Sequence, residues 1–348
     1  MEWISDSTPH NEPRMIRDPQ VPDFAYDFAN LASVRLGAVV TQVTDEFFAD
    51  KARMLQDAPA VFIPDKYDDN GKWMDGWETR RRRQGGHDWA IVKLAVPGVV
   101  KGLDIDTSHF TGNFPPAASL EGCRSGGEPD AKTKWTSLLP VTSLGSSRHH
   151  FFAVTDGAPV SHIRLQIFPD GGVARLRVYG QPVPAWKAGD TGTVHELSAL
   201  KNGGSIVAYN DAHYGNLPAF LMEGRGRNMG DGWETRRRRE PGNDWIIVAL
   251  GGTGTVEKIE VDTAFYRGNF PDRCSLQAAR VEQGTRASII TQSQFWPALM
   301  GEQKLSADTV HTFDGRQVIA LGPATHVKLN IYPDGGVSRL RVFGKLAS

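Results

Sequence analysis

The nine residues DGWETRRRR occur twice in this chain of 348 residues, at 75–83 and again at 231–239. Three further pairs of segments repeat in the same order, at separations of 156 to 164 positions: HDW (87–89) with NDW (243–245), DIDTSHFTGNFP (104–115) with EVDTAFYRGNFP (260–271), and HIRLQIFPDGGVARLRVYG (162–180) with HVKLNIYPDGGVSRLRVFG (326–344). A repeated unit of roughly 150 residues is a domain and not one turn of a solenoid. The chain is therefore predicted to be a tandem duplication of one domain.

The repeats set the expected domain boundaries. The first copy is predicted to span 17–180 and the second 193–348, with residues 1–16 as an N-terminal extension. The segment between the copies, 181–192, is rich in Pro and Gly and lacks hydrophobic periodicity, so it is expected to be a linker. The rise in separation from 156 to 164 predicts a longer connection inside the second copy.

The local pattern within each copy is that of short β-strands. In HIRLQIFP the residues Ile163, Leu165 and Ile167 alternate with polar side chains, which is the period of a half-buried strand. The segment 173–180 alternates as well, and the intervening PDGG is favourable for a tight turn, so the two segments are predicted to form a β-hairpin. Helical candidates are short, at 45–56 and in the corresponding part of the second copy. This pattern predicts an all-β chain with a jelly-roll β-sandwich in each half.

Charge and hydropathy exclude several classes of protein. The 39 Lys and Arg residues nearly balance the 40 Asp and Glu residues, so the whole chain has no strong attraction for nucleic acid or an anionic membrane. No segment approaches the roughly 18 uninterrupted apolar residues of a membrane span. The first residues are polar and lack the apolar core of a signal peptide. Two cysteines do not make a disulfide framework. The expectation is a cytoplasmic protein without a nucleic-acid or membrane partner.

The arginine run supplies the first candidates for a site. If GWETRRRR were a strand, alternate side chains would point to opposite faces, and Glu78, Arg80 and Arg82 would share one of them. One interpretation is structural, with the arginines paired to acidic groups at the rim of the sandwich. The other is that one Arg binds a substrate carboxylate through its planar, permanently charged guanidinium. Glu78 would then be its acidic partner or a proton-transfer group.

Differences between the copies supply further candidates. Three titratable residues of the first copy have counterparts in the second that do not titrate: His87 with Asn243, His109 with Phe265, and Glu121 with Gln277. Such differences favour the first copy as the one that carries the chemistry, although neutral surface drift is the alternative. The asymmetry is not one-sided, because His213 in the second copy corresponds to Phe47 in the first.

Metal and cofactor motifs are sparse. Asp104, Asp106 and His109 offer oxygen and imidazole ligands at short spacing. There is no HExxH, no Cys pair with zinc spacing, no phosphate-binding glycine loop and no GxSxG elbow. No cofactor is therefore required by the sequence, and a divalent metal stays open.

The repeated motifs, in this order and over nearly the whole chain, resemble the allantoicase family. The resemblance implies two jelly-roll modules of the galactose-binding-like type and a tendency to form homo-oligomers. It also implies the hydrolysis of a small molecule, allantoate, to ureidoglycolate and urea in purine breakdown through allantoin. The rival hypothesis is a non-catalytic β-sandwich that binds a carbohydrate or another small ligand, and the lack of a catalytic partner domain disfavours it.

The implied substrate assigns roles to the candidates. Allantoate is a carboxylate with two ureido groups on one carbon, and Arg80 or Arg82 suits its carboxylate. Expulsion of urea requires a proton donor and then activation of water, for which Glu78, His109 and Glu121 are the candidates. The nitrogen of one ureido group could expel the other and leave an iminium-like centre, which a nearby carboxylate would stabilise. The other residues predicted to bind substrate are Asp75, Asp106, Asn113, Glu234 and Arg236.

Overall fold

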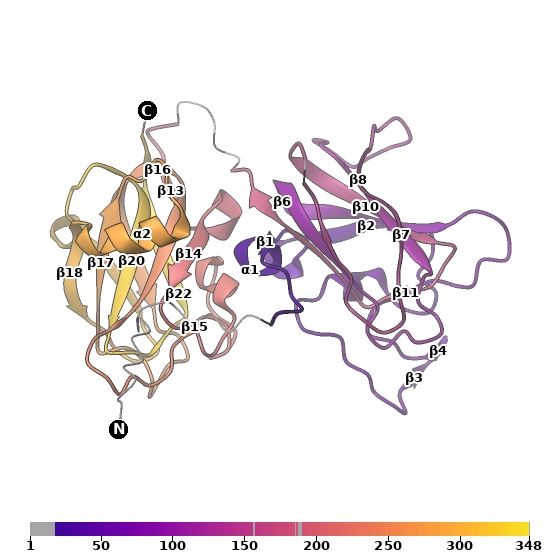
Figure 1. The fold of residues 1–348 in the computed structure, drawn as a ribbon, viewed down its shortest axis with the longest axis horizontal. Coiled ribbons are helices and arrows are strands. Elements are labelled where there is room, and N and C mark those ends of the chain that lie inside the picture. Colours follow the sequence, from indigo (N-terminus) through magenta and orange to yellow (C-terminus); the bar gives the residue numbers. More distant parts are fainter. Residues whose placement is uncertain (1–17, 156, 185, 187–189, 348) are drawn as a thin grey trace, which may run out of the picture. The chain divides into compact units, whose positions relative to one another are not determined.

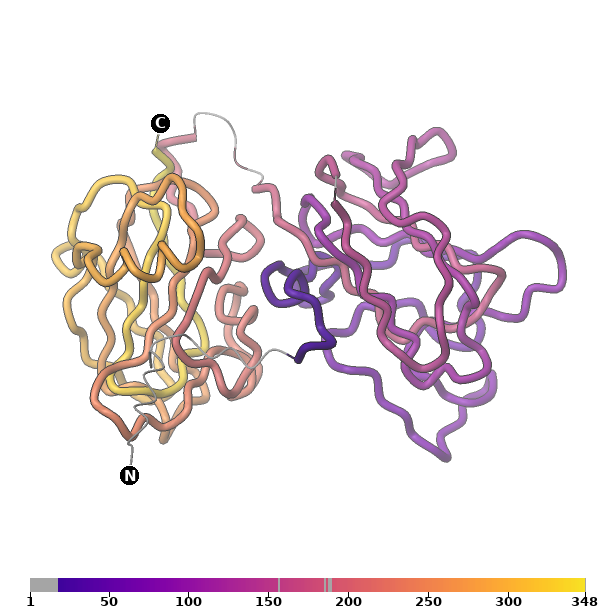
Figure 2. Tube along the Cα trace, viewed as in Figure 1, coloured from indigo at the N-terminus to yellow at the C-terminus, as the bar shows by residue number. Residues whose placement is uncertain are grey.

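The computed structural model describes residues 18–155, 157–184, 186 and 190–347. They form two compact units, one within 19–184 and one within 190–347, and strands dominate both (Figure 1). The Cα trace in Figure 2 follows the first unit from indigo to rose and the second from rose to yellow. The predicted N-terminal extension (1–16) and part of the predicted linker lie outside the described residues. Within the described residues, no helix has the length and apolarity needed to span a membrane.

The first unit is organised by β6 (Asp88–Asp106), a strand of 19 residues that pairs with two sets of strands. Its first part pairs with β2 (Val39–Val43) and β10 (Val160–Phe168), and β10 continues through β7 (Ala117–Cys123) to β8 (Thr136–Ser143). Its last part pairs with β9 (Phe151–Ala153) and β12 (Arg175–Pro182), and β12 continues to β1 (Ala29–Asn30). The sheet folds over along β6, so its two parts form the two layers of a jelly-roll sandwich. The alternating apolar residues of β10, Ile163, Leu165 and Ile167, are fully buried between them.

The second unit repeats this arrangement strand for strand. Its long strand is β16 (Asp244–Asp262), and the others are β13 (Val194–Glu196), β14 (Ser205–Tyr209), β17 (Arg273–Ala279), β18 (Ala298–Lys304), β19 (Val310–Asp314), β20 (Pro323–Tyr332) and β22 (Arg339–Leu346). The longer connection predicted for this copy lies between β17 and β18, where it forms α2 (Arg286–Gln292) and the 3-10 helix η5 (Ser293–Phe295). The all-β fold and the internal duplication are confirmed.

The predicted hairpin of residues 162–180 is wrong. Both of its strands exist as β10 and β12, but β6 lies between them in the sheet. The PDGG segment leads into β11 (Gly172–Val173), which pairs with β5 (Trp77–Glu78) in a separate two-stranded ladder. Period-2 alternation identifies a strand, but it contains no information about the partner of that strand.

The remaining elements are short. The helical candidate at 45–56 contains the 3-10 helix η2 (Lys51–Leu55), and its counterpart is η4 (Leu217–Leu221). The others are α1 (Phe24–Asp27), η1 (Val34–Leu36), β3 (Tyr67–Asp68), β4 (Gly71–Lys72), η3 (Leu200–Asn202), β15 (Trp233–Glu234), η6 (Gly315–Gln317) and β21 (Gly336–Val337). The β15–β21 ladder of the second unit corresponds to the β5–β11 ladder of the first.

Candidate active site

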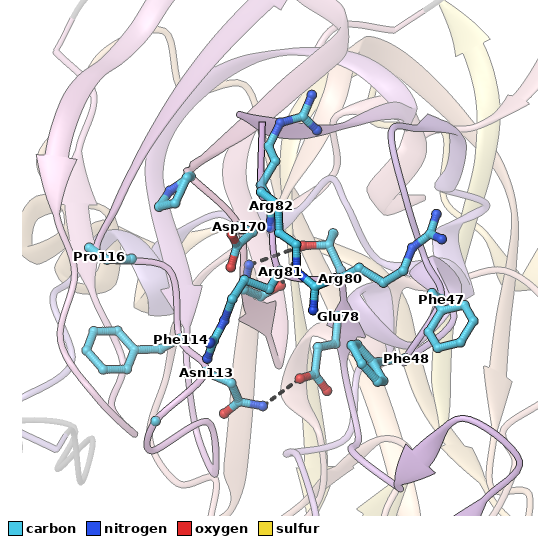
Figure 3. Close-up of a pocket in the computed structure, with 15 residues that line it drawn as sticks. Phe47, Phe48, Glu78, Arg80, Arg81, Arg82, Asn113, Phe114, Pro116 and Asp170 are labelled. Atoms are coloured by element: carbon cyan, nitrogen blue, oxygen red, sulfur yellow. Dashed lines mark hydrogen bonds between the residues drawn. The ribbon is translucent and has the colours of Figure 1, made fainter. Parts of the chain in front are cut away.

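A pocket of about 840 Å³ opens in the first unit beside the β5–β11 ladder. Its lining includes Glu78 of β5, the four arginines that follow, and the Asn113–Phe114 segment of the loop after β6 (Figure 3). Glu78 is held from both sides, because it pairs with Gly172 of β11 and its backbone exchanges hydrogen bonds with Ala49. The ladder thereby fixes one carboxyl group in the wall of the pocket.

The Glu78 carboxyl group is buried, with 9% of the residue exposed. Burial raises the pKa of Glu78, while the hydrogen bond from Asn113 acts in the opposite direction and Asp68 adds a small increase. In that bond the Asn113 Nδ2 donates to Glu78 Oε1 over 2.6 Å (Figure 3). A carboxyl group with a raised pKa is protonated closer to neutral pH than an ordinary one, which suits it to donate and accept protons.

Two consecutive glycines let Asn113 reach Glu78. Gly171 has φ +141°, and a Cβ there would lie 2.8 Å from the Asn113 carbonyl oxygen. At Gly172 a Cβ would lie 1.9 Å from the ring of the buried Phe110, and the Gly172 N–H donates to the Asn113 carbonyl over 2.7 Å. The two glycines of the PDGG segment therefore pack directly against the loop that carries Asn113 (the asparagine loop), at a distance that only glycine permits.

The arginine run is not a strand, although Arg80 and Arg82 still differ from Arg81 and Arg83 in their contacts, as alternation would group them. β5 ends at Glu78, and the next residues are fixed by contacts from other parts of the unit. The Thr79 N–H donates to the Gly171 carbonyl over 3.1 Å. The Arg80 N–H donates to the Asp45 carboxylate over 2.8 Å, and the Arg82 N–H donates to Asp170 over 2.7 Å. These anchors hold the run in an extended but irregular path along the pocket.

The anchored arginines also use their side chains in ion pairs. Arg80 Nε lies 3.0 Å from Asp45 Oδ2, and its guanidinium extends over the Phe47 ring, away from Glu78 (Figure 3). Arg82 Nη1 lies 2.6 Å from Asp88 Oδ1, and Asp88 is fully buried. Burial raises the pKa of Asp45, but the hydrogen bonds from Arg80 outweigh that effect and leave it below its usual value. For Arg80 and Arg82 the structural interpretation of the run therefore describes what is seen.

Arg81 and Arg83 differ from the two anchored arginines. Both are exposed and line the pocket. Neither has a hydrogen-bond or ion-pair partner within the ranges that the structure describes. The pocket thus combines two cations available to a ligand with one buried carboxyl group, an arrangement suited to a small anion that undergoes proton transfer.

Comparison with known proteins agrees with this architecture. The family model described as the allantoicase repeat matches residues 29–183 and again 195–347. "Probable allantoicase 1" of Burkholderia mallei is 57% identical over 95% of this chain and 98% of its own length. "Probable allantoicase" of Ralstonia nicotianae is 59% identical over 94% of this chain and 98% of its own length. The chain belongs to the allantoicase family.

A solved structure supports the assignment at the level of the fold. The crystal structure of allantoicase from Saccharomyces cerevisiae superposes with a TM-score of 0.76 at 32% identity, covering 92% of this chain and 96% of that one. A second solved allantoicase gives a TM-score of 0.74 at 35% identity, with coverage of 90% and 92%. The allantoicase fold is thus shared along both repeats.

Within this allantoicase fold, the structure brings together only some of the residues predicted to form a site. Glu78, Asn113, Arg80 and Arg82 all line the first pocket. Asp75 instead forms a buried ion pair with Arg175, whose Nη2 lies 2.7 Å from Asp75 Oδ2. Glu121 is on β7 and pairs with Arg164 of β10 at 2.5 Å. Neither Asp75 nor Glu121 lines the pocket.

His109 and Asp106 also lie away from the pocket lining. His109 has φ +70°, its Nε2 lies 3.2 Å from the Ala60 carbonyl oxygen, and its ring stacks on Phe62. Asp106 is buried and accepts a hydrogen bond from the Ser108 N–H over 2.7 Å. Within the part of the chain that the structure describes, no group of three or more His, Cys, Asp or Glu residues is arranged to hold a metal ion.

The imidazole beside Asp104 and Asp106 belongs to His149, not to His109. His149 Nδ1 lies 2.9 Å from Asp104 Oδ2, and this hydrogen bond raises the pKa of His149. His149 Nε2 lies 3.9 Å from Asp106 Oδ2. The two carboxylates thus face a residue from the segment just before β9, which sequence spacing does not link to them.

Several residues of the pocket were missed by the sequence reasoning. Asp45 anchors Arg80, and Phe47, Phe48 and Phe114 supply apolar walls. A signal for two of them is present in the duplication, because Asp45 corresponds to Asp211 and the GNFP segment occurs in both copies. Glu234 and Arg236, predicted to bind substrate, lie in the second unit at the positions equivalent to Glu78 and Arg80.

Proposed function

We propose that this chain is a hydrolase that converts allantoate and water into ureidoglycolate and urea. The observation that carries the proposal is the family match, since relatives that are 57–59% identical over almost their full length bear the name allantoicase. The chemistry of the first pocket supports it. Allantoate needs a cationic partner for its carboxylate and a proton donor for its leaving group, and the pocket contains candidates for both.

We assign the substrate carboxylate to Arg81 and Arg83. Their guanidinium groups are free of partners among the described residues, whereas Asp45 and Asp88 already compensate Arg80 and Arg82. Charge-assisted hydrogen bonds to a carboxylate are strong, and two guanidinium groups would fix its orientation. The rings of Phe47, Phe48 and Phe114 give the flat ureido groups an apolar surface to pack against.

We assign both proton transfers to Glu78. The carboxyl group in its protonated form donates a proton to the nitrogen of the departing urea, and the C–N bond to that nitrogen breaks. The lone pair of the remaining ureido nitrogen fills the gap and leaves an iminium-like carbon, which the Glu78 carboxylate stabilises. Water then adds to this carbon to form the C–O bond of ureidoglycolate, and its proton returns to Glu78. Each turnover consumes one water and restores the starting carboxyl group.

Asn113 has a positioning role in this scheme. Its amide donates to one oxygen of Glu78 and leaves the other oxygen for the substrate. Because the Asn113 amide is neutral, it orients the carboxyl group without lowering its pKa as strongly as an arginine partner would. His109 and Glu121 receive no role here, because neither lines the pocket.

Incubation of the purified protein with allantoate tests the proposal. Urea and ureidoglycolate are measured separately, with and without a chelator, for the wild type and for Glu78→Gln. The wild type is expected to release the two products in equal amounts, and Glu78→Gln to release them more slowly. Glu128→Gln, at an exposed site outside the pocket, serves as the matched control. Absence of urea from the wild type under both conditions would reject an allantoate hydrolase.

A further inference from the structure

The second unit repeats the contacts that build the first pocket. Asn269 Nδ2 donates to Glu234 Oε1 over 2.5 Å, as Asn113 does to Glu78. Burial raises the pKa of Glu234, with the bond from Asn269 acting in the opposite direction. A partly buried carboxyl group facing a neutral amide is thus present in both units.

The arginine run of the second unit is anchored in the same manner. Arg236 Nε lies 2.9 Å from Asp211, and Arg238 Nη2 lies 2.7 Å from the buried Asp244. The Arg238 N–H donates to Asp334 over 2.8 Å. Alternate arginines of this run are therefore fixed to carboxylates, as they are in the first unit.

The glycine support is also repeated. Gly335 has φ +140°, and a Cβ there would lie 2.7 Å from the Asn269 carbonyl oxygen. The Gly336 N–H donates to the same carbonyl over 2.8 Å, and a Cβ on Gly336 would lie 2.0 Å from the ring of Tyr266. In both units, the two glycines thus pack closely against the loop whose asparagine hydrogen-bonds to the glutamate carboxyl group.

Arg237 and Arg239 are left as available cations. They line a cavity of about 320 Å³ together with Arg236, Arg238, the aspartates Asp211 and Asp244 that pair with those two arginines, and Glu240. Glu234 and Asn269 are not part of this lining. Within the described ranges, neither Arg237 nor Arg239 has an ion-pair or hydrogen-bond partner. The second unit therefore has the same two kinds of group as the first: a half-buried carboxyl group at Glu234 on β15 and, from three residues further along the chain, guanidinium groups without partners among the described residues.

A purely structural reason does not account for this repetition. The arginine–aspartate pairs stabilise the fold, and a folding role explains their presence in both copies. A carboxyl group shielded from water without a cationic partner does the opposite, because desolvation disfavours its charged form. The two free arginines likewise contribute no contact that the fold needs. A carboxyl group that lowers stability and arginines that make no stabilising contact are better explained by a ligand that binds to them.

We propose that the second unit holds a second active site, with Glu234 as its proton-transfer group, which works on the same class of small ureido-substituted carboxylate. This inference rests on the proposed function. The titratable residues that distinguish the copies, such as His109 and Glu121, lie outside the first pocket, so their replacement does not disable the second site. The segment that contributes Phe47 and Phe48 in the first unit reads His213 and Tyr214 in the second. The two sites should therefore differ in KM.

Three variants test the second site: Glu78→Gln, Glu234→Gln and the double variant. Glutamine keeps the size of the side chain and the acceptor for Asn113 or Asn269, so the variants should fold. Each single variant is expected to retain urea release from allantoate, at a rate at least about 100-fold above that of the double variant, which is the lower range of the contribution of a general acid–base group. Thermal unfolding of all three checks that they are folded.

A variant at an exposed position gives a second readout. Arg237→Ala in the Glu78→Gln background is expected to raise KM for allantoate roughly tenfold or more, as loss of a charge-assisted hydrogen bond would. If Glu78→Gln is as inactive as the double variant, or if Arg237→Ala leaves KM unchanged, the second site is rejected. If Glu234→Gln alone abolishes turnover, two independent sites are rejected as well. Failure of the proposed function is distinct, because the wild type itself would then release no urea.

Discussion

Glu78 faces a neutral partner inside a pocket that four consecutive arginines also line. The hydrogen bond from Asn113 Nδ2 to Glu78 Oε1 orients the carboxyl group. Arg80 and Arg82, which follow Glu78 in the sequence, form ion pairs with Asp45 and Asp88 instead of with Glu78. Neighbouring arginines therefore have different roles. Arg80 and Arg82 stabilise the segment through ion pairs, whereas Arg81 and Arg83 are available to a ligand. Strand-like alternation groups Arg80 with Arg82, but it does not show which pair of arginines carries the ion pairs, because all four side chains are the same.

The raised pKa of Glu78 predicts how its removal changes stability with pH. A carboxyl group with a higher pKa in the folded state contributes stability while it is protonated, and that contribution is lost as the pH rises through the folded pKa. Glu78→Gln cannot ionise, so its melting temperature relative to the wild type should be higher at about pH 7 than at about pH 4. Calorimetry at the two pH values measures the difference. A constant offset between the two proteins would mean that Glu78 is not shielded as described.

The two kinds of arginine predict two kinds of defect. In the Glu234→Gln background, where only the first pocket is active, Arg81→Ala or Arg83→Ala should lower kcat/KM for allantoate by about 10- to 100-fold, mainly through KM, because a charge-assisted hydrogen bond contributes about 1.5–3 kcal/mol. Neither should lower the melting temperature. Arg82→Ala should instead destabilise the protein by about 1–3 kcal/mol, because it leaves the buried Asp88 without its cation.

Steady-state kinetics and thermal unfolding of these variants separate the two effects. Arg124→Ala is the matched control, since Arg124 is exposed and does not line the pocket. Loss of binding in Arg82→Ala without loss of stability would reverse the assignment of the arginines.

At the scale of elements, β11 and the asparagine loop depend on each other. A methyl group at Gly172 would meet the Phe110 ring at 1.9 Å, so Gly172→Ala must displace either the ring or the strand. The expected result is a loss of about 1–3 kcal/mol of stability, as for an overpacked core, together with a fall in allantoate turnover as Asn113 leaves Glu78. Gly126→Ala is the control, because nothing lies within 4 Å of a Cβ there. Unchanged turnover in Gly172→Ala would contradict the supporting role of β11.

The elements also mark the limit of what the sequence predicts. Alternation correctly identified β10 and β12 as strands, but not β6 as the strand between them, because alternation reports burial and not pairing. The arginine run, considered as a possible strand, is not one, since Asp45, Asp170 and Gly171 satisfy its backbone in place of a neighbouring strand. Those partners are distant in sequence, and no local pattern links them to the run.

For the whole molecule, the duplication was the most informative feature of the sequence. It predicted the two units and the location of the longer connection in the second, which the structure places between β17 and β18. It misdirected the choice of site residues toward positions that differ between the copies, such as His109 and Glu121. The pocket is built instead from positions that are the same in both, including the Glu–Asn pair and the glycines after the cis prolines Pro169 and Pro333.

The most direct test of the account is the release of urea from allantoate by the wild type and by the Glu78→Gln/Glu234→Gln double variant at equal concentrations of folded protein. We expect the wild type to release one urea and one ureidoglycolate for each allantoate consumed, and the double variant to be at least about 100-fold slower while it unfolds at a similar temperature. A double variant that releases urea at the wild-type rate would contradict the assignment of the chemistry to Glu78 and Glu234.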